Sequence, residues 1–186
     1  MKVTVQRSMA IVRKSALLVF TVLLCVGCSE DDFDPSRPNV GAFVEQLKRG
    51  TYSNYEKGDE GQDLWLKMPE FNEDHIAELI EYARDTTHIK VFPSNPLASM
   101  PPFPPNRDYL YLGEYLLWCV EGVRNGSGYG SLVPYLRPAN LPPSGISSAT
   151  DTDVLAAREK YLIWWKEYKD GDWKGHHPLE STDYTW

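Results

Sequence analysis

The sequence predicts a mainly α domain of about four to five helices joined by long Pro-rich loops. Apolar residues recur with the period of an amphipathic helix in several stretches, and no two segments show the alternation of a convincing strand pair. The 186 residues suit one ordinary globular domain. This succession of helices and loops is compatible with helical-repeat-like stacking, although the sequence has no internal period.

The first elements are two helices, over residues 40–49 and 73–84. In the first, Val40, Phe43, Val44 and Leu47 fall on one face, with Asn39 as the N-cap and Gly50 as the stop. The second follows Asn72, and it carries an apolar stripe. The acidic Glu73 and Asp74 in its first turn favour the positive end of the helix dipole.

A proline-rich segment separates the second helix from the third. Six prolines fall between Pro93 and Pro105, a density that neither a helix nor an inner strand accepts. One interpretation is a stiff strap packed across the helices, with Phe103 filling a gap. The other is that residues 100–105 form a polyproline II ligand for the aromatic groove of a partner.

The remaining helices are expected over residues 108–124, 131–136 and 152–169. The long third helix has an apolar face that includes Cys119 and ends near Gly126. The short helix tolerates Pro134 in its first turn. The last helix carries an apolar and aromatic stripe along one side.

The N-terminus predicts a secretory signal peptide over residues 1–27. Four basic residues without an acid precede Ala16–Gly27, which are apolar or small apart from Thr21. Such a segment spans about 18 Å as a helix, too short for the ~30 Å core of a bilayer. The boundary resembles the lipobox of bacterial lipoproteins, with Gly27 before the cysteine to be lipidated, Cys28. It departs from the pattern in having a cysteine where leucine is usual.

The residues after Cys28 predict a tether over residues 28–38. Its acidic run, Ser29–Asp34, resembles the surface-export tag of Bacteroidetes-type lipoproteins. We therefore expect a protein anchored to the outer membrane through acyl chains at Cys28 and displayed at the cell surface, with the periplasmic face as the alternative. The rest, residues 39–186, is expected to be a single helical domain with a polar, aromatic tail.

Charge and cysteine content exclude several classes of function. The chain has a formal charge of −7, and removing the basic leader makes the mature chain still more acidic. This surface disfavours nucleic-acid binding and offers no polybasic patch for anionic lipids. Once Cys28 is acylated, Cys119 is the remaining thiol of the mature chain, so no internal disulfide is expected.

Four blocks of sequence resemble a family of small uncharacterised Bacteroidetes-type lipoproteins. The blocks are Met68–Phe71, Ile89–Pro96, Leu112–Arg124 and Ser131–Leu136. The resemblance covers roughly residues 40–170. It implies a mainly helical extracytoplasmic domain and supplies no activity or catalytic residues.

The sequence singles out no catalytic residue, metal site or cofactor. His75 and Glu78 share a helix face but lack a third ligand at metal-binding spacing, and His176-His177 suggest at most adventitious binding. Cys119 lies on an apolar helix face, which is typical of an inert buried thiol. Glu121 and Arg124, three residues apart on a helix, are expected to form a surface ion pair.

Aromatic residues near the end of the last helix are the candidate binding surface. Trp164 is expected to face the core, with Trp165 at its edge. With Tyr168 and Trp173 they would form a partly exposed cluster that can stack on a sugar ring or anchor a protein contact. The alternative is that the tail folds back and Trp173 covers Trp165, which closes the core.

Three functions remain open at this stage. The absence of recognisable chemistry, together with the anchor, favours a protein-interaction module or an accessory subunit of an outer-membrane complex. The aromatic content allows a surface lipoprotein that binds a glycan or a peptide. A hydrolase with an unrecognised pair of carboxylates is the third, but no enzyme activity is expected.

Overall fold

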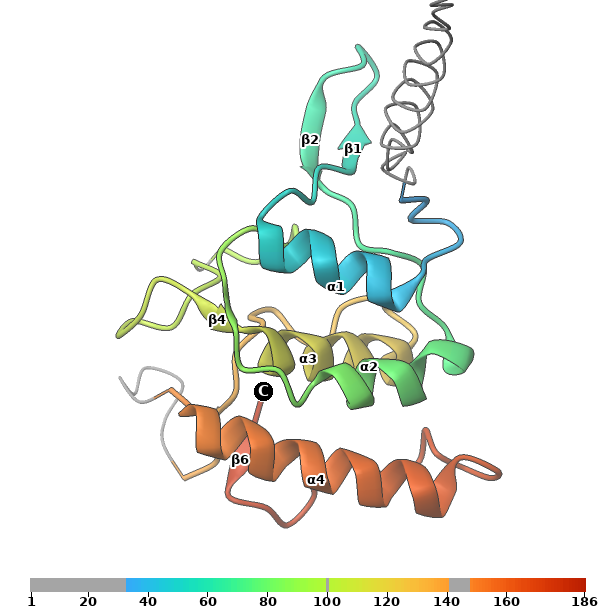
Figure 1. Ribbon diagram of the computed structural model, residues 1–186, viewed down its shortest axis with the longest axis vertical. Helices are drawn as coiled ribbons and strands as arrows, with labels where there is room; N and C mark the ends of the chain where they lie inside the picture. The colour runs from blue at the N-terminus through green and yellow to red at the C-terminus, as the bar shows by residue number, and fades with distance from the viewer. Residues whose placement is uncertain (1–32, 100, 141–147) are drawn as a thin grey trace, which may run out of the picture. The chain divides into compact units, whose positions relative to one another are not determined.

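Four α-helices and three two-stranded antiparallel sheets make up the part of the chain that the structure describes (Figure 1). This computed structural model describes residues 33–99, 101–140 and 148–186. The predicted leader, Cys28 and the first residues of the predicted tether lie outside these ranges. The described residues belong to a unit that begins at Phe33, whose ring stacks on Phe43 with 5.8 Å between centroids.

The prediction of a mainly α fold is wrong, because the architecture is mixed. The sheets pair β1 (Tyr55–Lys57) with β2 (Asp63–Leu66), β3 (His88–Ile89) with β4 (Leu110–Tyr111), and β5 (Arg137–Pro138) with β6 (Tyr184–Thr185). Strands of two to four residues are too short to show a period of two. In the last two sheets the partners are also far apart in sequence. The expectation of helical-repeat-like stacking is also wrong, because strands lie between the helices.

The first two helices form close to where the sequence predicts them. Helix α1 (Val40–Arg49) has the predicted bounds, and Asn39 Oδ1 accepts a hydrogen bond from Ala42 N at 2.8 Å. The second prediction becomes a 3-10 turn, η1 (Glu73–His75), that continues as α2 (Ile76–Tyr82). The apolar faces of both helices are buried, as their spacing predicts.

Helix α3 (Leu112–Asn125) is the centre of the fold. It contacts the other three α-helices, and every residue from Leu112 to Gly122 is buried. A helix is buried all round only when neighbours surround it. The predicted start at residue 108 is too early, because Leu110–Tyr111 form β4. Gly113 allows the close packing, since a Cβ there would lie 2.1 Å from the Ala83 carbonyl oxygen.

Helix α4 (Asp151–Tyr168) closes the opposite side of the core from α1. Its N-terminus is capped by Thr150, whose Oγ1 accepts from Asp153 N at 3.3 Å. Val154, Ala157, Tyr161 and Trp164 are its buried residues. In Figure 1, α2 and α3 lie between α1 and α4, in agreement with the contacts between these helices. Within the described residues, no helix combines the length and apolar character needed to cross a membrane.

The predicted short helix over residues 131–136 is wrong. The segment is irregular and leads into β5. Ser131 Oγ donates to the Val133 carbonyl at 2.6 Å and accepts from Trp118 Nε1 at 2.9 Å. A serine that binds its own backbone neighbours competes with helix formation, and Pro134 contributes no backbone donor.

The Pro-rich segment packs against the helices in the way expected of a strap. Tyr115 of α3 donates its hydroxyl hydrogen to the Pro93 carbonyl at 2.8 Å. The Phe103 ring meets the Phe92 ring edge-on at 5.5 Å, and Pro104 is buried. These contacts favour the strap over the polyproline ligand, because a ligand segment would have to leave its contacts before binding a partner.

The β1–β2 hairpin projects away from the helices (Figure 1). Lys67 N donates to the Asn54 carbonyl at 2.8 Å, and Tyr52 donates its hydroxyl hydrogen to the Lys67 carbonyl. Tyr52 itself is buried in the core, so the base of the hairpin is fixed while its strands extend outward.

Candidate functional site

The four residues of the predicted aromatic surface lie together, but two of them are in the interior. Trp164 is 3% exposed and Trp173 is 6% exposed, whereas Trp165 and Tyr168 are half-buried. The Trp173 ring lies 5.8 Å from the Trp165 ring and 6.2 Å from the Trp164 ring. Trp164 Nε1 donates to the Trp173 carbonyl at 3.2 Å. The tail therefore folds back over the end of α4.

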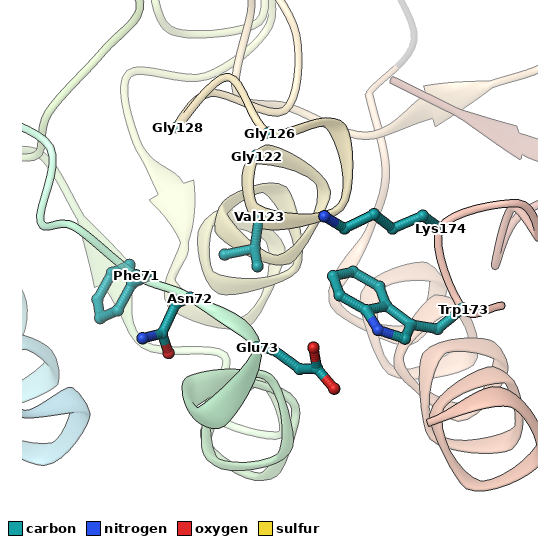
Figure 2. A pocket seen from close by; sticks show the side chains of 9 residues that line it. All are labelled: Phe71, Asn72, Glu73, Gly122, Val123, Gly126, Gly128, Trp173 and Lys174. Atoms are coloured by element: carbon teal, nitrogen blue, oxygen red, sulfur yellow. The ribbon is translucent and has the colours of Figure 1, made fainter. Parts of the chain in front are cut away.

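A cleft of about 370 Å³ opens on one side of this tail (Figure 2). One wall is the segment before α2, with Phe71, Asn72 and Glu73, and the other is the tail, with Trp173 and Lys174. Between them lies the C-terminal end of α3, which contributes Val123 and backbone at Gly122 and Gly126. The cleft thus combines part of an indole ring, a valine side chain, glycine backbone and two charged side chains.

The two charged residues of this cleft have opposite signs and stand on opposite walls. In Figure 2 the Glu73 carboxylate points toward the Trp173 ring, and the Lys174 side chain extends toward the end of α3 that carries Val123. Lys174 Nζ lies 5.1 Å from the centroid of the Trp173 ring. Within the described residues, neither Glu73 nor Lys174 forms an ion pair.

A second hollow of about 310 Å³ lies between α4 and the tail. Trp164 and Tyr168 line it from the helix, and His176 and His177 line it from the tail. The His176 ring stacks on the Tyr168 ring at 3.9 Å, so one face of that tyrosine is covered. The predicted aromatic surface is thus divided: Trp173 faces the first cleft, and Trp164 and Tyr168 face the second.

A buried polar network at Glu121 supports the tail between the two clefts. Glu121 Oε2 accepts from Arg124 Nε at 2.9 Å and from Nη2 at 2.8 Å, and Oε1 accepts from the Tyr161 hydroxyl at 2.6 Å. Arg124 Nη1 donates to the Lys174 carbonyl at 3.3 Å, and Trp186 Nε1 donates to the Tyr161 hydroxyl at 2.9 Å. One glutamate thereby connects α3, α4 and the tail.

The expectation of a surface ion pair at Glu121 and Arg124 is wrong, because the pair is largely buried. The side chains are 2% and 13% exposed. The i, i+3 spacing predicts the contact correctly, but burial depends on α4 and the tail, which are distant in sequence. A signal was available nevertheless, since Glu121 lies seven residues after Glu114 in a helix that is otherwise apolar along this face.

Glu114 forms the corresponding pair near the start of α3. Both of its carboxylate oxygens accept from Arg107 Nη2 at 2.7 Å, and Oε1 also accepts from Leu136 N at 2.8 Å. The Arg107 side chain is 6% exposed and lies over the Tyr111 ring at 4.7 Å. Burial raises the pKa of the Glu114 carboxyl above its ordinary value, while Arg107 acts to lower it.

The other residues considered from the sequence have structural surroundings. His75 Nδ1 accepts from Asn72 N at 3.1 Å, and its Nε2 lies 3.2 Å from the Pro38 carbonyl oxygen, so both ring nitrogens are engaged. Burial raises the pKa of the Cys119 thiol, which favours the unreactive protonated form. Among the described residues, no three His, Cys, Asp or Glu side chains are arranged to hold a metal ion.

Comparison with known protein families identifies the family of this chain. The family described as a domain of unknown function, DUF4943, matches residues 34–186. The chain belongs to the DUF4943 family. The match spans every helix and strand described above, including the hairpin, both clefts and the two buried glutamates. No curated protein and no solved structure matches this DUF4943 chain.

The sequence predicts the aromatic part of this cleft but not its charged part. Trp173 belongs to the predicted surface, whereas the position of Glu73 indicates only a helix start and no pattern marks Lys174. These two residues lie about one hundred positions apart in the sequence. The folding of the tail back toward α3 brings them to one cleft.

Proposed function

We propose that this DUF4943 protein is a lipid-anchored extracytoplasmic domain that binds another protein of the cell envelope, as an accessory subunit of an outer-membrane complex. The basic leader, the short apolar segment and Gly27-Cys28 support the anchor and the location. The exposed β1–β2 hairpin supports the interaction.

The hairpin exposes three large apolar side chains. Tyr55 is 40% exposed, Leu64 is 45% exposed and Trp65 is 42% exposed. Tyr55 pairs with Leu66 and Lys57 pairs with Asp63, so the register is irregular where β2 carries Leu64 and Trp65. Apolar groups gathered on a projecting element are typical of protein contact sites, where burial contributes about 25 cal/mol per Å².

The anchor is tested by metabolic labelling with a radioactive fatty acid. The wild-type protein should be labelled and the Cys28→Ser variant should not, because the thiol is the acceptor. Equal labelling of the two proteins would refute the anchor. Protease treatment of intact cells then distinguishes surface display, in which the protein is cleaved, from a periplasmic location, in which it is protected.

The interaction is tested by photocrosslinking in intact cells. A photoreactive phenylalanine analogue at position 65 should give one discrete protein adduct. The same analogue at position 155 serves as the matched control, because Leu155 is a 40% exposed apolar residue on α4, away from the hairpin. No adduct from position 65, or the same adduct from both positions, would contradict a hairpin-specific partner.

The cleft beside the tail favours a second candidate function, the binding of a glycan or a peptide. Its volume of about 370 Å³ falls within the range of roughly 300–1,000 Å³ that is usual for small-ligand sites. The edge of the Trp173 indole and the two opposite charges give it both apolar and polar contacts. This candidate uses a region of the domain different from the hairpin, so the two are tested separately.

A further inference from the structure

We propose that the cleft between Glu73 and Lys174 binds a small zwitterion, either an amino acid or a short peptide with an apolar side chain. The proposal rests on the second candidate function above and names its ligand class. It does not depend on the hairpin. Three features of the cleft carry it: the sign and placement of its charges, its apolar surfaces and its size.

The charges select a ligand with one positive and one negative group. Glu73 and Lys174 project into the same cleft from opposite walls (Figure 2). Neither is neutralised by an ion pair within the described residues, so both can bind a group of opposite charge. A free ammonium would lie at Glu73 and a carboxylate at Lys174. A neutral sugar would leave both charges without a charged partner, and ionised donors and acceptors form the stronger hydrogen bonds.

The lining between the two charges includes apolar side chains. The Val123 side chain points into the cleft from α3, and the Trp173 ring forms the wall beside it (Figure 2). The indole is held by packing against the Trp165 ring at 5.8 Å and the Trp164 ring at 6.2 Å, and the Trp173 backbone carbonyl accepts from Trp164 Nε1 at 3.2 Å. A wall that is fixed before binding reduces the entropy lost on association. An apolar side chain between the ammonium and the carboxylate would cover Val123 and the exposed edge of Trp173.

The size of the cleft limits the ligand to one or two residues. A water molecule occupies about 30 Å³ in the liquid, so 370 Å³ corresponds to roughly a dozen water molecules. This is room for about a dozen non-hydrogen atoms, the size of a large amino acid or a small dipeptide. A longer peptide would have to leave the cleft, and only one of its termini would then contact a charged wall.

The position of Lys174 links the cleft to the buried network beneath it. Its carbonyl accepts from Arg124 Nη1 at 3.3 Å, and Arg124 is in turn held by Glu121. The backbone of the lysine is therefore attached to α3, while its ammonium stays in the cleft. The wall that carries the positive charge is fixed by the same glutamate that connects α3, α4 and the tail.

The test is calorimetric titration of the mature full-length protein, solubilised in detergent, with the dipeptide alanyl-leucine. Two derivatives each lack one charge: N-acetyl-alanyl-leucine has no ammonium, and alanyl-leucine amide has no carboxylate. The free dipeptide should bind, and each derivative should bind at least tenfold more weakly. Maltose is the glycan probe and should not bind.

Variants assign each charge to its wall. Glu73→Gln should weaken binding of the free dipeptide about tenfold and leave the residual binding of the N-acetyl derivative unchanged. Lys174→Met should do the same with respect to the amide derivative. Asp74→Asn and Lys169→Gln are the matched controls, because they remove like charges nearby that do not line the cleft. Both controls should bind as the wild type does.

Several results would overturn the proposal. They are no binding of alanyl-leucine at millimolar concentration, equal binding of the free and capped dipeptides, and equal loss of affinity in the control variants. Binding of maltose that Trp173→Ala weakens, but that is insensitive to Glu73→Gln and Lys174→Met, would assign the cleft to a neutral glycan instead. That last result would retain the second candidate function and refute only the ligand class.

Discussion

Glu114 and Glu121 lie two turns apart on α3, and each is buried with an arginine, yet the two ends of the helix differ. At Glu114 every carboxylate contact comes from Arg107 or from backbone N–H groups of Leu136 and Tyr111. This end is closed. At Glu121 the partners include Tyr161 and Arg124, and the tail beside them borders two clefts. We refer to this end of α3, at Glu121, as the open end.

The difference shows what a buried glutamate contributes in this fold. At the closed end it binds Arg107, two residues after Pro105, and so attaches the end of the Pro-rich segment to the core. At the open end it fixes the tail that forms a wall of the candidate ligand cleft. We infer that substitutions at Glu114 act on stability alone, whereas those around Glu121 act on both stability and the cleft.

The largest effect is expected for Glu114→Leu, which leaves the Arg107 guanidinium buried without its carboxylate. Breaking a buried ion pair from one side costs about 3–5 kcal/mol of unfolding free energy. Urea unfolding at pH 7 measures the loss. Glu159→Leu, which removes an exposed glutamate from α4, is the control and should stay within about 0.5 kcal/mol of the wild type.

The double variant Arg107→Leu with Glu114→Leu sharpens this test. Removing both charges also removes the unpaired guanidinium, so part of the lost stability should return. If Glu114→Leu alone destabilises by less than about 1 kcal/mol, the closed end of α3 does not depend on the ion pair.

Trp173→Ala is expected to have the next largest effect, a loss of about 3 kcal/mol, because the ring is almost wholly buried. Trp165→Ala should cost clearly less, since Trp165 is half-buried. Thermal unfolding of both variants measures what each ring contributes to stability. Titration with alanyl-leucine measures what each ring contributes to binding. Equal loss of stability in the two variants would contradict the expectation that the more buried ring contributes more to stability. Normal dipeptide binding by a folded Trp173→Ala protein would show that the indole does not contribute to the binding site.

Tyr161→Phe tests the open end with a smaller change. It removes the hydroxyl that donates to Glu121 and accepts from Trp186 Nε1, so we expect a loss of about 1–2 kcal/mol. Hydrogen exchange should quicken in the tail, over residues 173–186, more than in the Pro-rich segment. Tyr55→Phe on the exposed hairpin is the matched control. Equally faster hydrogen exchange throughout the domain would show that the Glu121 network stabilises the whole fold and not the tail in particular.

The smallest effect concerns pH at the closed end. Burial raises the pKa of Glu114 above its ordinary value of 4.5, so between that value and the raised pKa the native state keeps a proton that the unfolded state loses. The contribution of this group to the free energy of unfolding therefore falls as the pH rises through that window. In Glu114→Gln this fall should be absent, which urea unfolding at pH 4 and pH 6 would show. An identical pH dependence in both proteins would indicate that the Glu114 pKa is not raised.

Local sequence determined the main helices. The bounds of α1 follow from an apolar spacing, an N-cap and a terminating glycine, and those of α4 follow to within one residue from an apolar and aromatic stripe. Both signals involve neighbours three or four positions apart, which a helix brings together by itself. Trp118 of α3 and Tyr161 of α4 are both fully buried. The leader and Cys28 remain predictions from sequence patterns alone.

Tertiary structure alone decided the sheets, the burial of charge and the cleft. His88 pairs with Tyr111 and Arg137 pairs with Thr185 across long stretches of chain, so no local pattern marks those strands. Glu121 is buried because α4 and the tail cover it, although its spacing from Arg124 is equally typical of a surface pair. Glu73 and Lys174 share a cleft only after the tail has folded back. Burial and site geometry depend on which distant segments meet, whereas helix bounds depend on residues one turn apart.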